Sequence, residues 1–163
     1  MREWVPVPGT TKGRLVQGAL TEFGGRGYEA VSVTELAERA GVTIGSLYHH
    51  FGSKAGLYTA VREDVERRLL DRMEGAAAVA SGDAGAVLLV GFDYLVRAGL
   101  ARMLAEPHPE RQSDPVEQFL AASMNEGGPP VSSLLVAAWR AALELAVHDR
   151  DGARAALRAV VQP

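Results

Sequence analysis

The residues best suited to chemistry are a run of small and hydrogen-bonding side chains between Thr43 and Lys54. Gly45 and Ser46 are small enough to let a helix backbone approach a partner closely. Tyr48 and His49 carry polar groups that can donate hydrogen bonds to base edges or phosphates. This combination indicates a surface that binds a polar or anionic partner.

Metal binding and catalysis are poor explanations of the same residues. His49 and His50 are adjacent, so on a helix they point about 100° apart and cannot easily share one ion. The sequence has no cysteine, and no pattern brings a serine, a histidine and an aspartate together. We therefore expect no metal, no cofactor and no enzymatic activity.

Three short helices are predicted to position this surface. Apolar residues at helical spacing indicate a first helix from about Lys12 to Gly24. Ser32 and Glu35 have the spacing of a capping box, which predicts a second helix that ends at Gly41. Thr43 can cap a third helix over Ile44–Phe51. A helix, a turn that begins with glycine and a second short helix form a helix-turn-helix pattern.

The residues Val33–Leu57, and Leu47–Lys54 in particular, closely resemble the DNA-binding signature of the TetR/AcrR family of bacterial regulators. The preceding Phe23–Tyr28 segment is also similar to the end of that family's first helix. The resemblance is strong from about Lys12 to Leu57. It implies a recognition helix that enters the major groove of DNA.

The resemblance also assigns roles to individual residues. It implies that base edges are read by Ile44, Gly45, Ser46 and His49, just after Thr43. It implies that phosphates are contacted by Val33, Thr34, Tyr48, His50 and Lys54.

The expected fold is all-α, with an N-terminal arm and helix-turn-helix DNA-binding domain at 1–56 and a helical regulatory and dimerisation domain at 57–163. Helices are predicted at 54–80, 84–105 and 116–125, with a loop at 106–115 and a break at 127–130. A final antiparallel pair is predicted at 131–147 and 152–161. The arginines between Arg62 and Arg72 alternate with acids, which predicts a solvated helix face.

By resemblance, the last two helices form a dimer interface. Its candidates are Leu134, Ala138, Ala141, Leu145, Ala153, Ala156, Leu157 and Val160. The family also binds a small-molecule inducer among its central helices. Candidates for lining that pocket are Phe92, Leu95, Met103, Phe119, Met124 and Trp139. The short central segment with its Pro-rich loop departs from the family pattern and leaves a full-sized cavity open to question.

Composition fits this reading without proving it. The chain of 163 residues is 47% hydrophobic and carries a net charge of −3, with +1 on residues 1–56. No apolar run resembles a signal peptide or a membrane span, so we expect a cytoplasmic protein without a membrane partner. We predict a transcriptional regulator that binds a palindromic operator in double-stranded DNA as a homodimer and acts as a repressor. The alternative is a helical ligand-binding or protein-interaction module without operator recognition, and the sequence does not separate a repressor from an activator.

Overall fold

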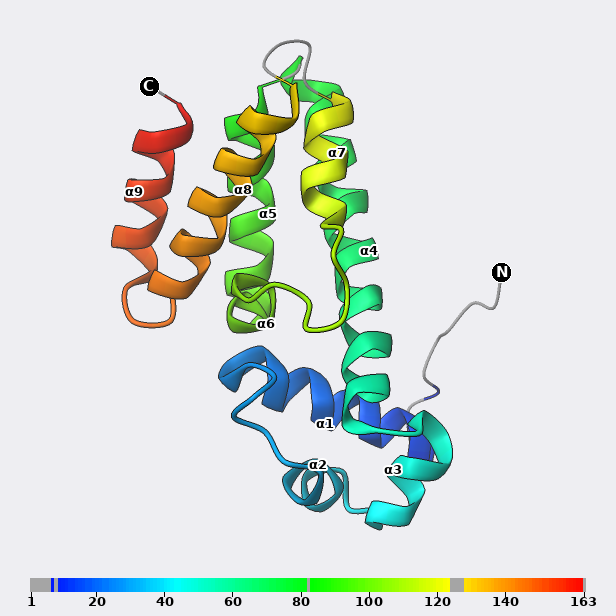
Figure 1. Ribbon diagram of the computed structural model, residues 1–163. Helices are drawn as coiled ribbons and strands as arrows, with labels where there is room; N and C mark the ends of the chain where they lie inside the picture. The colour runs from blue at the N-terminus through cyan, green and yellow to red at the C-terminus, as the bar shows by residue number, and fades with distance from the viewer. Residues whose placement is uncertain (1–6, 8, 82, 124–127, 163) are drawn as a thin grey trace.

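The computed structural model describes residues 7, 9–81, 83–123 and 128–162, and within them the regular structure is entirely helical (Figure 1). This confirms the all-α fold. The helices are α1 (Thr11–Arg26), α2 (Val33–Ala40), α3 (Ile44–Phe51), α4 (Lys54–Ala80), α5 (Ala84–Ala98), α6 (Ala101–Ala105), α7 (Pro115–Ser123), α8 (Gly128–Leu145) and α9 (Arg150–Val161).

The first four helices begin where side-chain caps satisfy free backbone N–H groups. Ser32 and Glu35 form the predicted capping box, in which each side chain accepts from the other residue's backbone N–H. Thr43 accepts from the Ser46 N–H, and Ser53 accepts from the Gly56 N–H. These caps explain why the predicted starts of α2, α3 and α4 agree with the structure.

The helices α1, α2 and α3 form one end of the molecule, and α4 leads from them along the length of the rest (Figure 1). The helix α4 packs against α5 and α7, while α8 packs against α6, α7 and α9. The helix α9 lies at the outer edge of the bundle, against α5 and α8. A single long helix thus connects the N-terminal end to the bundle.

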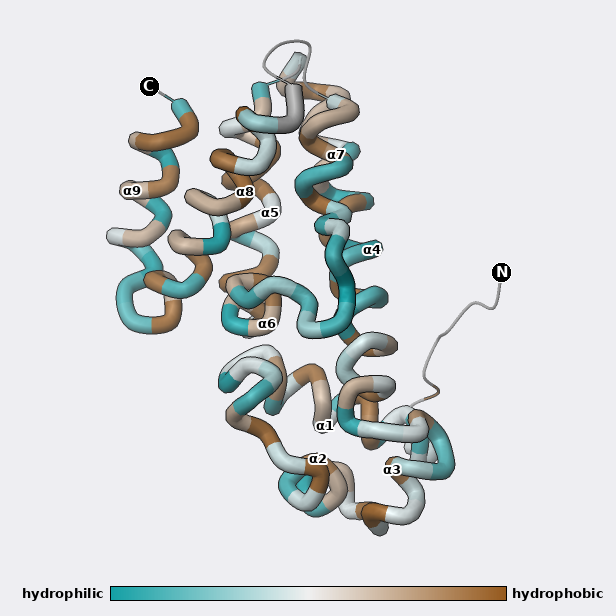
Figure 2. The backbone as a smooth tube through the Cα atoms, viewed as in Figure 1, coloured by the Kyte–Doolittle hydropathy of each residue, from teal (hydrophilic) through white to brown (hydrophobic). Residues whose placement is uncertain are grey.

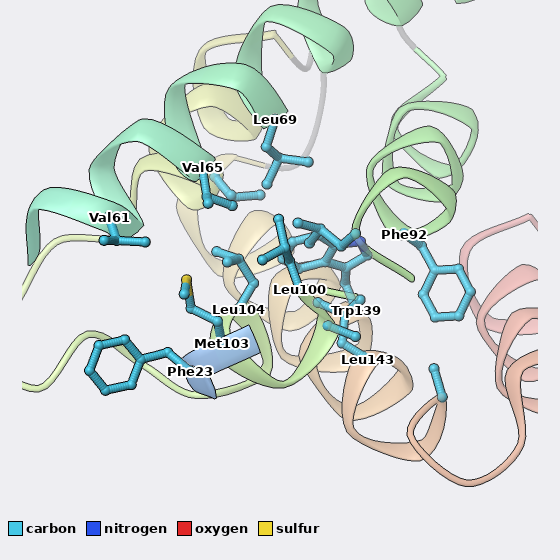
Figure 3. Close-up of a cluster of buried hydrophobic side chains, with 14 of the residues drawn as sticks. Phe23, Val61, Val65, Leu69, Phe92, Leu100, Met103, Leu104, Trp139 and Leu143 are labelled. Atoms are coloured by element: carbon cyan, nitrogen blue, oxygen red, sulfur yellow. The ribbon is translucent and has the colours of Figure 1, made fainter. Parts of the chain in front are cut away.

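One continuous hydrophobic core runs through both ends. Figure 3 shows Phe23 of α1 and Val61 of α4 in the same cluster as Trp139 of α8. The Trp139 side chain is fully buried, and its indole N–H donates to the Leu88 carbonyl over 3.0 Å. Because the core is shared, the N-terminal helices are held firmly against the bundle.

The contact between α1 and the bundle is unusually close at Gly24. A Cβ atom on Gly24 would lie 2.5 Å from the Gly99 carbonyl oxygen. Gly99 itself has a φ of +71°, a left-handed conformation that favours glycine. Two glycines therefore define the point at which the two halves meet.

Gly99 also corrects the expected helix over 84–105. The helix α5 ends at this residue, whose N–H donates back to the Val96 carbonyl, and α6 begins two residues later. The helix α8 begins at Gly128, so residues 128–130, predicted as part of a break, are helical. Prolines are tolerated there because the first turn of a helix has N–H groups without intrahelical partners.

The predicted solvated face of α4 is wrong at its N-terminal part. Arg62, Asp64 and Glu66 are at most 4% exposed, whereas Arg67 and Arg68 lie in solvent and pair with Asp64. Arg62 follows Tyr58 by one helical turn, so it faces the bundle with the apolar stripe. In the described part of the chain, no helix has both the length and the apolar character needed to cross a membrane.

Candidate nucleic-acid interface

The helix α3 is anchored by the buried side chain of Leu47 and by contacts at both of its ends. Leu47 is fully buried, and Phe51 is half-buried with the Lys12 ammonium 5.9 Å from its ring centre. The turn before α3 is closed by Gly41, whose φ of +62° is left-handed. Only a narrow side of this short helix is needed for anchoring, so the remainder faces solvent.

The predicted base-reading residues lie on this outward side. Ile44 is 40% exposed, Gly45 and His49 are also exposed, and Ser46 is half-buried. The Ser46 hydroxyl forms a 2.9 Å hydrogen bond with the hydroxyl of Thr43, the N-cap of α3. A Cβ on Gly45 would meet only the Thr43 hydroxyl, at 3.7 Å. The structure therefore brings these residues together on one free surface.

The predicted phosphate contacts surround that surface. Tyr48 is 50% exposed, and Thr34 and His50 are exposed. Val33 is half-buried and packs against the core, so its backbone at the start of α2 is the part available to a phosphate. These positions stay predictions, and their exposure fits the roles that the resemblance implies.

Lys54 has a role that sequence reasoning missed. Its ammonium donates to the carbonyls of Tyr28 (3.0 Å) and Val31 (3.1 Å). It also lies 4.0 Å from the centre of the Tyr28 ring. Two of its three donors thus hold the segment between α1 and α2, and one remains for a phosphate.

The start of α2 is also stabilised electrostatically. Glu35 receives the Ser32 backbone N–H over 2.7 Å and the Arg26 guanidinium over 2.8 Å. The backbone hydrogen bond from Ser32, then the Ser32 side chain and Arg26, lower the pKa of Glu35 to about 2. Among the described residues no group of three or more potential ligands could hold a metal ion.

The predicted dimer residues divide into two groups. Leu134 (72%), Leu145 (56%) and Val160 (60%) are exposed, as are Ala141 and Ala156, while Ala138 is half-buried. Figure 2 shows hydrophobic residues recurring along α8 and α9. Together these positions form an outward apolar face.

Ala153 and Leu157 form the second group. They are 3% and 2% exposed because α9 turns them towards its own bundle. These two side chains therefore pack within one chain and leave little surface for a partner.

The predicted pocket residues are mostly core. Phe92, Leu95, Met103 and Trp139 are at most 1% exposed, and Phe119 is half-buried against the same core. Met124 lies outside the described residues. Two hollows of about 270 and 320 Å³ lie elsewhere, beside α1, and share Gln17, Leu20 and Arg68. No sequence signal pointed to them, because they form between helices far apart in the chain.

Comparison with known proteins matches residues 15–61 to the family described as bacterial regulatory proteins, tetR family. The transcriptional repressor KstR2 of Mycolicibacterium smegmatis is 41% identical over 68 residues, which cover 42% of this chain and 31% of KstR2. The A-factor receptor protein of Streptomyces griseus is 28% identical over 161 residues, covering 90% of this chain and 58% of the receptor. The chain thus spans less than two thirds of these relatives.

Solved structures show the same fold. A putative tetR family transcription regulator from Shewanella sp. PV-4 superposes with a TM-score of 0.60 at 18% identity, covering 93% of this chain and 96% of that one. A γ-butyrolactone receptor described as an ArpA like protein gives a TM-score of 0.56 at 20% identity, covering 92% and 97%. The matched region contains the helix-turn-helix described above.

Proposed function

We propose that this chain, whose N-terminal helices match the tetR family of bacterial regulatory proteins over residues 15–61, is a sequence-specific DNA-binding transcriptional repressor. It works in the cytoplasm as a homodimer on a palindromic operator. A small-molecule inducer lowers its affinity for DNA. The single observation that carries this function is the free outer surface of α3, which is anchored by Leu47 and presents small and polar residues.

The groove of B-DNA explains why this surface suits a duplex. The major groove admits one α-helix, and the helix N-terminus carries a partial positive charge that favours phosphates. Here the N-terminal turn of α3 contains Gly45, whose missing side chain leaves the backbone accessible. The neighbouring helix α2 holds α3 from behind, so recognition needs no rearrangement within the domain.

The apolar face of α8 and α9 supports the dimer. Large exposed hydrophobic side chains such as Leu134 and Leu145 are costly unless a partner covers them. A two-fold axis through this face pairs it with itself. Two recognition helices about 34–36 Å apart then read half-sites on successive turns of the duplex.

Ligand control is supported by two of the similar proteins, whose names describe them as receptors. The mechanism requires an inducer that binds one dimer geometry more tightly than the other.

Selection of bound fragments from random duplex DNA tests the function. We expect enrichment of a palindromic sequence by the wild-type chain. A Gly45→Glu variant keeps the fold, because a Cβ there meets no backbone, but places a carboxylate against the groove. It is expected to enrich nothing.

Gly75→Glu is the matched control. Gly75 is also an exposed helical glycine, with nothing within 4 Å of an added Cβ. This variant is expected to enrich the wild-type sequence. Absence of enrichment by the wild-type chain supports the alternative of a binding module without operator recognition. Equal enrichment by Gly45→Glu would mean that α3 is not the surface that reads DNA.

A further inference from the structure

A small polar hollow lies between α4, the loop that joins α6 to α7, and α8. Its volume is about 60 Å³. The charged and titratable groups that line it are Arg62, Glu66, His108, Arg111, Asp114 and Arg140. The described residues that the sequence proposed for a ligand pocket do not line it, and its lining includes three guanidinium groups.

The charges of the side chains that line the hollow do not balance. Asp114 pairs with Arg140, with 2.5 Å between the carboxylate and the guanidinium. Glu66 is shared, because one oxygen accepts from Arg62 over 2.9 Å and the other from Arg111 over 2.5 Å. Two guanidinium groups therefore share one carboxylate, and the side chains that line the hollow carry three positive charges and two negative ones, with the Glu110 carboxylate close by outside the lining.

His108 does not change this balance. Its Nδ1 accepts from the Glu110 N–H over 3.1 Å, and its Nε2 lies 3.3 Å from the Thr59 hydroxyl. Burial, followed by the charges of Arg62 and Arg111, lowers the pKa of His108. The imidazole is thus neutral at pH 7 and adds no charge.

Arg111 has a buried donor without an acceptor. Among the described residues, its Nε is the buried side-chain atom that forms no hydrogen bond. Buried N–H groups in proteins almost always find a partner, since an unpaired one loses its hydration without compensation. The Arg111 guanidinium is held in place by Glu66, so the unpaired N–H has a fixed position.

We propose that this hollow binds a small carboxylate monoanion, of the size of acetate, against Arg111. A carboxylate matches the planar guanidinium and neutralises one positive charge of the lining. The volume is several times smaller than the ~300 Å³ at which pockets for drug-sized ligands begin, which favours a small anion.

The hollow is also connected to the DNA-binding end, which gives the site a regulatory role if the proposed function holds. Arg62 donates to the Tyr58 hydroxyl over 2.8 Å, and the Tyr58 ring centre lies 4.8 Å from that of Tyr28. Tyr28 is the residue that Lys54 holds. At the start of the loop, Glu106 accepts from the Tyr28 N–H over 3.3 Å. An anion that shifts Arg62 or the loop thus acts on the base of the helix-turn-helix.

Thermal unfolding of the full chain tests the site without DNA. The chain is titrated with sodium acetate, sodium chloride or sodium phosphate at constant ionic strength, with a bulky sulfonate as the background anion. We expect acetate to raise the Tm saturably, by roughly 5 °C at one hundred times its Kd. No saturable rise with acetate, or a rise at lower concentrations of chloride or phosphate, overturns the carboxylate assignment.

Arg111→Lys separates binding at the hollow from a general salt effect. Lysine keeps a cation opposite Glu66 but has no Nε–H, so the acetate-dependent rise should disappear while the Tm without acetate stays close to wild type. Arg150→Lys is the matched control at the exposed first residue of α9, and it should keep the full rise. An equal rise in both variants overturns the proposal.

The regulatory part has its own measurement. Acetate should change the Kd for the selected duplex at least threefold in the wild type and not in Arg111→Lys. A Tm rise without any change in that Kd overturns the regulatory role alone. Failure of the DNA selection overturns the proposed function, while the thermal titration still decides whether the hollow binds an anion.

Discussion

Lys54 and Tyr48 were both predicted to contact phosphates, yet the structure gives them different surroundings. Tyr48 is half exposed and contributes little to the core. Lys54 donates to two backbone carbonyls that would otherwise lose a partner. Replacement of Lys54 should therefore lower stability as well as DNA affinity, whereas replacement of Tyr48 should affect DNA affinity almost alone.

Replacement of these two residues should separate DNA affinity from stability. Tyr48→Phe is expected to weaken binding to all sequences by about 2- to 10-fold, the effect of one lost hydrogen bond, with an unchanged free energy of unfolding. Lys54→Met is expected to lower that free energy by about 1.5–3 kcal/mol, since hydrogen bonds from a charged group are lost. Urea unfolding and fluorescence anisotropy measure the two effects; equal stability of both variants would contradict the structural role of Lys54.

Arg62 was predicted to lie on a solvated helix face, but the structure buries it. It is 1% exposed and donates to Glu66, to the Tyr58 hydroxyl and to the Met103 carbonyl. Removal of one partner of a buried ion pair leaves the other charge without compensation.

Arg62→Met should therefore lower the free energy of unfolding by about 3–5 kcal/mol. Arg67→Met, the same change in the same helix, removes a guanidinium that is 59% exposed, and such surface pairs contribute only about 0–1 kcal/mol. Denaturant unfolding of both variants measures the difference. Similar losses in the two variants would mean that the buried network does not stabilise the fold.

At the scale of the element, α2 depends on its capping box. The pKa of Glu35 is about 2, below its ordinary 4.5, because the Ser32 backbone, the Ser32 side chain and Arg26 favour the carboxylate. A lowered pKa means that the stabilisation is complete above pH 4.5 and is lost as the pH falls towards 2.

Glu35→Gln should remove that part of the pH dependence. Glutamine keeps the capping geometry but carries no charge, so the variant is expected to be less stable at pH 7 and to lose less stability between pH 4.5 and pH 3. Chemical unfolding at those three pH values compares the two proteins. Parallel pH profiles would show that the carboxylate of Glu35 adds nothing.

The starts of α2, α3 and α4 could be predicted because each cap is local in sequence. The helix α9 begins at Arg150, two residues before its predicted start, although its Asp149 cap is equally local. Ser32, Thr43 and Ser53 each bond to a backbone group three residues on, so the signal lies within one turn. The division between α5 and α6 at Gly99 was missed because the surrounding apolar spacing continues through it. Gly99 caps α5 in a left-handed conformation, the same local role that Gly41 has at the end of α2.

The site was predictable to the same extent. The outward residues of α3 follow from helical spacing once Leu47 is taken as the anchor. The burial of Arg62 does not, since its acceptor at the Met103 carbonyl lies 41 positions further on. One clue was available, because Arg62 lies one turn from both Tyr58 and Glu66 on the apolar side of α4.

At the scale of the whole molecule, the exposed apolar face of α8 and α9 should hold two chains together. Leu134→Arg places a charge at its most exposed large side chain (72%) and is expected to give a monomer with at least tenfold weaker operator binding. Val79→Arg is the control, because Val79 is 86% exposed on α4, away from this face. Sedimentation of the three proteins measures the assembly; a Leu134→Arg dimer would place the interface elsewhere.

The close approach of Gly24 to Gly99 also bears on how such proteins can be recombined. With an added Cβ only 2.5 Å from the opposing carbonyl, the junction has no room for even an alanine on α1. An engineered chimera that joins these N-terminal helices to another regulator's body therefore has to keep the glycine at position 24. A side chain there would push α1 away from the backbone of residue 99.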